Sequence, residues 1–169
     1  LAQQAMTTQR SLHSTLLVDL AKAFERTDWN WLAHLFHQYD MPPWMQAYFQ
    51  WTRTKRVTFP KVLRSVVKPL HPVVGLDMGR ACSVLLFCLS IDPLLRKLNA
   101  LNPRVLRAYM DDTTITAPGT AFIGPAQDVF LSFSPVGLVV DQHTCCSFRP
   151  VAEDTGDVAG CSSYQRAAS

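Results

Sequence analysis

The order of apolar and polar residues predicts a strand and two helices in the first third of the chain. Thr15–Leu20 is an apolar, partly β-branched run of strand length, and Asp19 is its one acidic residue. Apolar residues then recur at helical spacing after Asp28, a residue type that caps helix N-termini. A second helix is predicted over Trp44–Thr54.

Two hairpins with a helix between them are predicted in the middle of the chain. Arg56–Val67 has the alternation of a β-hairpin, and Val105–Thr116 forms a second one around a polar turn. Between them, Ser83 opens an apolar helix over Val84–Ile91, which we expect Pro93 to kink before Leu94–Leu98 continues it.

The remaining elements complete a mixed fold. A weak helix over 121–133 precedes short strands over 137–141 and 145–148, and small polar residues follow. The order strand, helix, helix, hairpin, helix, hairpin, helix, strand is typical of an α+β fold, with an antiparallel sheet backed by helices. We therefore expect an N-terminal polar segment (1–14), one domain (15–149) and a flexible tail (150–169).

Composition narrows the class of protein. The chain of 169 residues is 48% apolar, which is enough for one core. Its longest apolar run, Cys82–Ile91, is too short to span a membrane. Five cysteines without a C-x-x-C spacing favour reduced thiols in an intracellular compartment over a disulfide framework. His143, Cys145 and Cys146 have the wrong spacing for a zinc site.

Basic residues are concentrated in one stretch, although the net charge is only +3. No acidic residue occurs between Arg53 and Lys68. This stretch is either a strip that contacts nucleic-acid phosphates or the solvated face of a hairpin. The candidate phosphate-contacting residues are Arg53, Lys55, Arg56, Lys61 and Arg64.

Three carboxylates occupy positions that suggest chemistry. Asp19 ends an apolar strand, and Asp111 and Asp112 form the tip of a predicted hairpin. If the two strands are neighbours, these carboxylates meet at one sheet edge and are able to hold the two Mg²⁺ ions of phosphoryl transfer. The alternative is that the aspartates are only a polar hairpin turn.

Several segments around these residues resemble the motifs of one enzyme family, in the family's order and with similar spacing. The segments are Val18–Phe24, Gly75–Phe87 with Ile91–Leu95, Ala108–Thr113 and Gly137–Asp141. Together they resemble the palm of reverse transcriptases, especially those of non-LTR retrotransposons and group II introns. The resemblance implies a ferredoxin-like α+β fold and RNA-directed DNA polymerase activity.

The resemblance also implies roles for individual carboxylates and aromatics. Asp19 and Asp111 match the metal-binding aspartates, and Asp112 is their catalytic neighbour. Phe24 matches the aromatic gate that excludes a ribose 2′-hydroxyl, with a core phenylalanine as the alternative. Tyr109 is expected to pack beneath the hairpin, near the primer end.

The loop and helix of the second motif match the part of the family that faces the nucleotide and the template. Gly79 and Ser83 occupy these positions, and their alternatives are an ordinary loop glycine and a helix N-cap. Met78 stands where the family has Gln, which removes a hydrogen-bonding group. Thr144 stands where a Lys is usual, and Glu25 where a second Asp is common.

Activity of this chain alone is not expected, because effective catalysis also needs a grip on the duplex and the nucleotide. Basic fingers precede the first motif in the family, whereas Arg10 is the one basic residue before Asp19 here, and no thumb follows Phe148. An active enzyme would use Mg²⁺ or Mn²⁺, an RNA template and a DNA primer. The alternative is a non-catalytic, retroelement-derived structural subunit that binds other proteins. Trp44, Tyr48 and Trp51 would then be either interface anchors or core residues.

Overall fold

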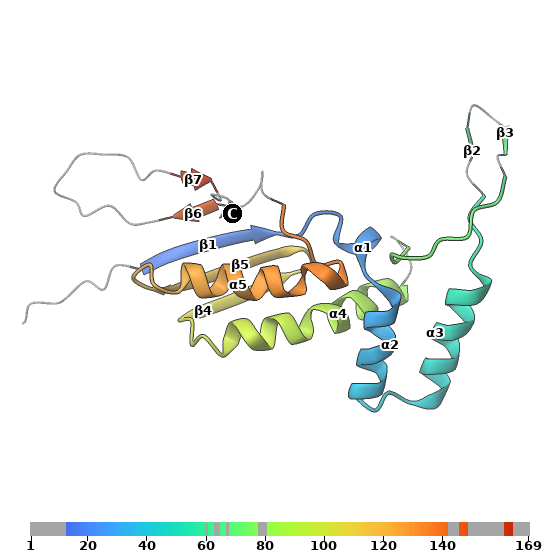
Figure 1. Cartoon of the computed structure of the whole chain (residues 1–169), viewed down its shortest axis with the longest axis horizontal. Helices are drawn as coiled ribbons and strands as arrows, with labels where there is room; N and C mark the ends of the chain where they lie inside the picture. The colour runs from blue at the N-terminus through green and yellow to red at the C-terminus, as the bar shows by residue number, and fades with distance from the viewer. Residues whose placement is uncertain are drawn as a thin grey trace, which may run out of the picture.

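The computed structural model describes residues 13–59, 61–62, 65–66, 68–77, 81–141, 146–148 and 161–163. Figure 1 shows a sheet carrying helices on one face, with two further helices and a small hairpin to one side. The strands are β1 (His13–Asp19), β2 (Lys61–Val62), β3 (Ser65–Val66), β4 (Val105–Tyr109), β5 (Asp112–Pro118), β6 (Cys146–Phe148) and β7 (Cys161–Ser163). The helices are α1 (Ala23–Arg26), α2 (Trp29–Gln38), α3 (Pro43–Lys55), α4 (Ala81–Asn99), α5 (Ile123–Phe133) and the 3₁₀ helix η1 (Ser134–Val136).

The main sheet has the strand order β4-β5-β1-β6-β7, and every neighbouring pair is antiparallel. Strands and helices alternate as β1-α4-β4-β5-α5-β6, which is the split βαβ arrangement of a ferredoxin-like fold. The segment α1–α3 is inserted between β1 and α4. The predicted α+β palm with an antiparallel sheet backed by helices is therefore confirmed.

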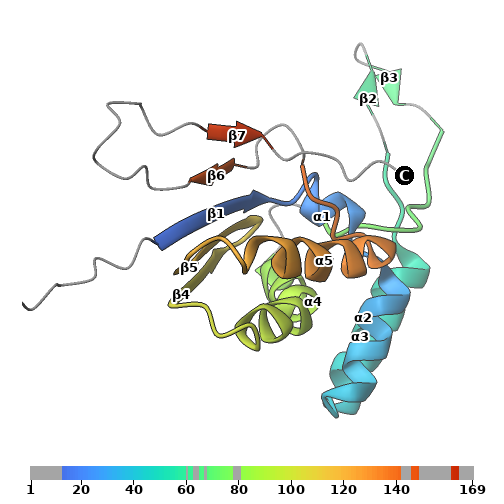
Figure 2. The same ribbon diagram turned by 60° about the vertical axis from the view of Figure 1, so that its left-hand side comes forward.

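Alternating burial fixes which sheet face meets the helices. On β1 the side chains of Leu16 and Val18 are 1% and 3% exposed, and on β5 that of Ile115 is 2% exposed. These residues share the core with Phe87 of α4 and Phe130 of α5. Figures 1 and 2 show both helices against this face of the sheet. None of the described helices covers the opposite face.

Helix α2 forms as the sequence predicts. The Asp28 side chain accepts hydrogen bonds from the backbone N–H groups of Asn30 and Trp31 and so caps the helix. Its apolar residues Leu32 and Leu35 are fully buried. This stripe packs α2 against α4 and fixes the inserted segment to the domain.

Helix α3 differs from its predicted amphipathic packing. Phe49 is buried and meets Phe36 of α2 edge-on, with ring centroids 4.9 Å apart. Tyr48 and Trp51 are 48% and 59% exposed instead of belonging to the core. The reason is that α3 packs mainly on α2, so aromatic residues on its other sides have no described element to cover them.

The central helix continues beyond Pro93 over Leu94–Leu98, as predicted, but it begins earlier than predicted, and a kink at Pro93 stays a prediction. Helix α4 runs as one helix through Pro93, and it begins at Ala81, before Ser83. A proline in a helix removes one backbone hydrogen bond. The buried stripe of Phe87, Leu94 and Leu98 extends on both sides of the proline, and we attribute the continuity of the helix to this packing.

The first predicted hairpin is present but short, since β2 and β3 pair two residues each. Thr58 and Leu70 extend the pairing through two backbone hydrogen bonds of 2.8 Å. Figure 1 shows this hairpin away from the main sheet.

The structure differs from the prediction at two places in the C-terminal part of the chain. Of the expected strand over 137–141, the structure has a single bridge between Val140 and Leu20. Gly137, at φ 92°, ends η1 there. Residues 161–163, inside the expected flexible tail, form β7 on the edge of the sheet. The predicted N-terminal segment lies outside the described residues except for its last two, which belong to β1.

Candidate active site

The ends of β1 and β5 bring the predicted carboxylates to one place. In the antiparallel register, Asp19 lies directly opposite Asp112. Asp111 is in the turn one residue earlier, and its backbone carbonyl accepts a 3.1 Å hydrogen bond from the Leu20 N–H. Directly opposed residues project from the same face, so Asp19 and Asp112 share the open face of the sheet.

The turn between β4 and β5 is tight, and Met110 adopts a left-handed conformation there with φ of 53°. A positive φ at the first central residue suits a two-residue hairpin connection. The connection sets Tyr109 opposite Asp112, just as Asp112 is set opposite Asp19. Tyr109, Asp112 and Asp19 therefore form one row across three neighbouring strands.

The open face beside this row is polar and hollowed. A hollow of about 460 Å³ is lined by β1 and β5, including Asp19, Asp112 and Thr114. Arg107 of β4 lies opposite Thr114 and is exposed. This face presents carboxylates at its end and a cation on its edge strand.

Tyr109 corrects one expectation. Instead of packing beneath the hairpin, its side chain is 77% exposed. The reason is that β4 is the edge strand, and Tyr109 projects from the face that the described helices leave open. A role in nucleotide binding stays a prediction.

The carboxylates at the ends of β1 and β5 supply only some of the oxygen ligands that Mg²⁺ needs. Among the described residues no group of three or more His, Cys, Asp or Glu side chains could hold a metal ion. Mg²⁺, however, is commonly held by one or two carboxylates, with substrate phosphates and water supplying the other oxygens. Asp19 and Asp111 are the predicted metal ligands, and the register adds Asp112 opposite Asp19, so three carboxylates gather where such a site is predicted. Their metal-binding role stays a prediction.

Phe24 is held between the first motif and α4. Its ring stacks on Phe87 at 4.7 Å between centroids, and it is half-buried against the core. Its backbone carbonyl accepts a 2.7 Å hydrogen bond from the Leu76 N–H. The packing predicted by the core alternative is thus present, and the gating role stays a prediction.

The start of the second motif is bound to the inserted helices. Gly75, at φ 84°, donates its N–H to the Thr27 carbonyl at 2.9 Å. A Cβ at this position would collide with the backbone of Glu25, so glycine is required by this close approach. The Gly75 carbonyl in turn accepts 2.7 Å hydrogen bonds from Trp29 Nε1 and Arg56 Nη1.

Of the other residues predicted to act in this motif, one lies in the described part of the chain and one lies outside it. Gly79, with Met78, lies outside the described residues. Ser83 is 3% exposed on α4, and it lines a cavity between α3 and α4. Its position inside the helix excludes the N-cap alternative. Thr144, like His143 and Cys145, also lies outside the described part of the chain.

The described residues of the predicted basic strip have different environments. Arg56 forms an ion pair with Asp77, and its guanidinium lies 5.6 Å from the centre of the Trp29 ring. Its side chain is 13% exposed, because it links α3 to the loop before α4. Arg56 is therefore a structural residue, which corrects the phosphate-contact prediction for this position.

The remaining cations of the strip have separate environments. Arg53 donates a 2.9 Å hydrogen bond to the Asn30 side chain, and Lys55 is exposed at the end of α3. Only the backbone of Lys61 is described, and Arg64 lies outside the described residues. Phosphate contacts by these four residues stay a prediction.

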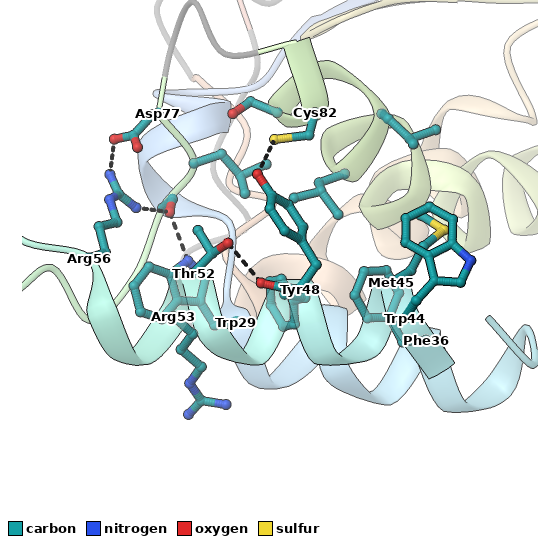
Figure 3. A pocket seen from close by; sticks show the side chains of 16 residues that line it. Trp29, Phe36, Trp44, Met45, Tyr48, Thr52, Arg53, Arg56, Asp77 and Cys82 are labelled. Carbon is teal, nitrogen blue, oxygen red and sulfur yellow. Dashed lines mark hydrogen bonds and ion pairs between the residues drawn. The ribbon is translucent and has the colours of Figure 1, made fainter. Parts of the chain in front are cut away.

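The sequence pattern does not predict the cavity of about 190 Å³ between α3, α4 and the loop at 75–77 (Figure 3). Trp44 and Tyr48 were interpreted as core or interface residues, and their i, i+4 spacing was the available signal. A second missed neighbour is Asp141, whose N–H donates a 2.8 Å hydrogen bond to the Asp19 carbonyl. It brings a further acidic residue to the end of β1.

No described helix is long and apolar enough to cross a membrane.

Solved structures of telomerases share this fold at low sequence identity. Apo telomerase from Candida tropicalis, truncated from its C-terminal domain, matches with a TM-score of 0.58 and 12% identity. Telomerases from Candida albicans and Candida tropicalis, each in complex with a TWJ fragment of telomeric RNA, match with TM-scores of 0.63 and 0.66 and 10% identity. These three matches cover 90%, 86% and 90% of this chain but only 34%, 27% and 28% of the respective telomerase chains.

Sequence comparison assigns the family. No curated relative matches the chain. The model of the family described as reverse transcriptase (RNA-dependent DNA polymerase) matches residues 2–146, which is most of the 169-residue chain. That range includes the row of Asp19, Asp112 and Tyr109 and the ferredoxin-like core beneath it. The chain therefore belongs to the reverse transcriptase family.

Proposed function

We propose that this chain supplies the palm of an RNA-directed DNA polymerase, and that its aspartates promote nucleotide transfer onto a primer. The observation that carries the proposal is the register that sets Asp19 opposite Asp112 at the end of the open sheet face, with Asp111 in the adjoining turn. Family membership supports it, as do the telomerase neighbours solved with RNA.

In this proposal Asp19 and Asp111 would hold divalent metal ions, with Asp112 as their neighbour at the end of β5. Such ions lower the pKa of an attacking hydroxyl and neutralise charge on the transferred phosphoryl group. The protein contributes the placement of the carboxylates, which the β1–β5 pairing makes rigid. The open face beside them, with Arg107 and Tyr109 exposed, is where a primer and template would lie.

Phe24 would act on substrate choice. Its ring is fixed by stacking on Phe87, and a fixed ring is able to exclude a 2′-hydroxyl by contact. In primer extension, Phe24→Val is expected to raise incorporation of ribonucleotides relative to deoxyribonucleotides. An unchanged ratio in an otherwise active protein would remove Phe24 from this role.

The first test is metal binding by the intact 169-residue chain. Mn²⁺ is titrated while the NMR signals of the backbone are followed, because the ion broadens resonances near its site. Selective broadening around Asp19 and Asp112 is expected, and Asp19→Asn should abolish it. Asp128→Asn, an exposed change on α5, serves as the control. Broadening that is uniform, or that persists in Asp19→Asn, refutes the metal site.

The second test is extension of a DNA primer on an RNA template by the same chain, alone and with the remaining parts of a polymerase supplied. The structural neighbours are about three times longer than the part matched here, and we expect no extension by the chain alone. Extension that appears on complementation and is lost in Asp19→Asn supports the catalytic proposal.

A non-catalytic role in a larger assembly is the second candidate. The observation that favours it is the exposure of Trp44 and Trp51 on α3, at 69% and 59%. Exposed tryptophans are enriched at protein interfaces. The two candidates differ in one outcome, since Asp19→Asn should leave assembly intact in a purely structural subunit.

A further inference from the structure

The cavity between α3 and α4 has an apolar floor and an apolar rim. Buried Phe49 and Leu76 line it from below. The rim residues Trp44, Tyr48 and Leu85 also line it, and they are 69%, 48% and 54% exposed. Figure 3 shows Trp44 at one end, with the Arg56–Asp77 pair at the other. A concave apolar site surrounded by exposed aromatic residues is the usual anatomy of a binding hot spot.

The size of the cavity suits a single large apolar group. Its volume is about 190 Å³. A cavity of about 150 Å³ accommodates benzene, so one aromatic or long aliphatic side chain would fit here. Filling it would remove the exposed rim from water, which is favourable in proportion to the apolar area buried.

The lining of the cavity offers few free polar groups, since several already have partners and Arg56 Nε is a buried one that has none among the described residues. The Tyr48 hydroxyl lies 3.8 Å from Cys82 Sγ, and the Thr52 hydroxyl donates a 2.8 Å hydrogen bond to the Tyr48 carbonyl. Arg56 is paired with Asp77. A nucleobase inserted here would therefore bury polar edges without partners, which is costly. A hydrocarbon side chain carries no such cost.

The charged side chains that line the cavity are Arg53, Arg56 and Asp77, and because Arg56 and Asp77 pair with each other, Arg53 leaves the lining with a net positive charge. The sequence contains no Asp or Glu from Met41 to Leu76, which includes the whole of α3. Arg53 lines the cavity, and Lys55 is exposed two residues further along the helix, at its end. This charge would attract an acidic segment and steer its approach.

We propose that the groove between α3 and α4 binds an acidic amphipathic segment of another protein, which inserts one large apolar side chain into the cavity. Two adjacent helices with a hydrophobic groove form a common recognition surface for such a segment. The proposal goes beyond the catalytic role, and it holds whether or not the aspartates bind metal.

The test is selection of displayed random peptides, about three helical turns long, against the 169-residue chain. Enrichment is expected for acidic sequences with Trp, Phe or Leu at i, i+3 or i+4 positions. Binding of the enriched peptides is then measured by fluorescence anisotropy. The same assay includes a single-stranded oligouridine as competitor.

A matched pair of variants locates the site on α3. Trp44→Ala removes a rim residue of the cavity, and we expect at least about tenfold weaker peptide binding. Gln50→Ala removes an exposed side chain from the same helix that does not line the cavity, and binding should change less than about threefold. Both side chains are exposed, so neither change should unfold the chain. Circular dichroism checks this.

Two cysteines of α4 provide an independent readout. Cys82 lines the cavity, whereas Cys88 is exposed outside it. Bound peptide should slow alkylation of Cys82 several-fold and leave Cys88 unchanged, as followed by mass spectrometry of the digested protein. The double variant Arg53→Gln/Lys55→Gln should weaken binding and reduce its salt dependence.

Three results would overturn the proposal. One is failure to enrich any peptide whose binding needs Trp44. Another is enrichment of basic or uncharged peptides, which contradicts the charge argument. The third is displacement of peptide by oligouridine with protection of Cys82, which would make the groove a nucleic-acid site instead.

Discussion

Arg56 and Asp77 form an ion pair that joins the end of α3 to the loop in front of α4. The same guanidinium donates to the Gly75 carbonyl and lies over the Trp29 ring. The side chains of the pair are 13% and 28% exposed, so water screens it only in part. Arg56 thus fixes the beginning of the second family motif to the inserted helices.

Removing this contact should destabilise the chain. Arg56→Ala is expected to lower the free energy of unfolding by about 2 kcal/mol, because Asp77 loses its cation and the Gly75 carbonyl loses a donor. The buried Arg56 Nε has no hydrogen-bond partner among the described residues, which keeps the expected loss moderate. Urea unfolding measures this change in the free energy of unfolding. Lys55→Ala, one residue away and exposed, should change stability by less than about 0.5 kcal/mol. Equal effects of the two changes would contradict the structural role of Arg56.

Two glycines should respond in opposite directions to alanine. Gly137 has φ of 92°, and a Cβ there would collide with the Arg26 backbone. Gly137→Ala should therefore cost at least about 2 kcal/mol of unfolding free energy. Gly124, in the first turn of α5, has open space around its Cβ position, and Gly124→Ala should gain up to about 1 kcal/mol. Thermal unfolding of the two variants compares them directly, and a tolerated Gly137→Ala would refute the close approach.

A polar contact between α2 and α4 should depend on pH. The Tyr39 hydroxyl donates a 2.6 Å hydrogen bond to Asp92, which also accepts one from Arg96. Burial acts to raise the pKa of Asp92, but the hydrogen bonds from Tyr39 and Arg96 outweigh it and leave this pKa below its ordinary value of 3.8. A depressed carboxyl pKa stabilises the fold above about pH 4, and this contribution is lost as the pH falls through the folded-state pKa.

Tyr39→Phe measures this contribution. The Asp92 side chain is 38% exposed, so we expect a loss of only about 0.5–1 kcal/mol at pH 7. The loss should shrink as the pH falls below 3.8, because the carboxylate that accepts the hydrogen bond becomes protonated. Burial and then the Asp92 contact raise the pKa of Tyr39, so the wild type should also lose stability above about pH 10. A difference between wild type and variant that is constant with pH would contradict the arrangement.

The opposed carboxylates should be sensitive to divalent cations. Like charges directly across a strand pair are unfavourable, so Asp112→Asn should raise stability by about 0.2–1 kcal/mol in the presence of a chelator. Adding Mg²⁺ should stabilise the wild type and so reduce the difference in unfolding free energy between the wild type and Asp112→Asn. Thermal unfolding with and without Mg²⁺ tests the expectation, with Asp128→Asn as the control. If Mg²⁺ shifts the unfolding temperatures of Asp112→Asn and Asp128→Asn equally, the ion has only a general salt effect.

Local sequence determined most of the secondary structure, because its signals are short-range. Helix α2 follows from the Asp28 cap and the buried Leu32 and Leu35, which need only helical spacing to be recognised. The second hairpin likewise followed from polar residues between apolar strands, although its turn is at Met110 and Asp111, one residue before the predicted tip at Asp111 and Asp112. The family motifs placed Asp19 and Asp112 in one predicted site before their strands were known to pair.

Only the tertiary structure decided which long-range partners these residues have. Arg56 was indistinguishable from its basic neighbours in the sequence, because its contact with Asp77 depends on how a distant loop returns to α3. Pro93 is unfavourable inside a helix by its local chemistry, yet α4 continues through it, with buried residues on both sides. Tyr48 and Trp51 have the pattern of a packed face, but they are exposed because no described element covers them. Hydrophobic spacing tells which residues are able to be buried, whereas burial itself depends on what the rest of the chain places against them.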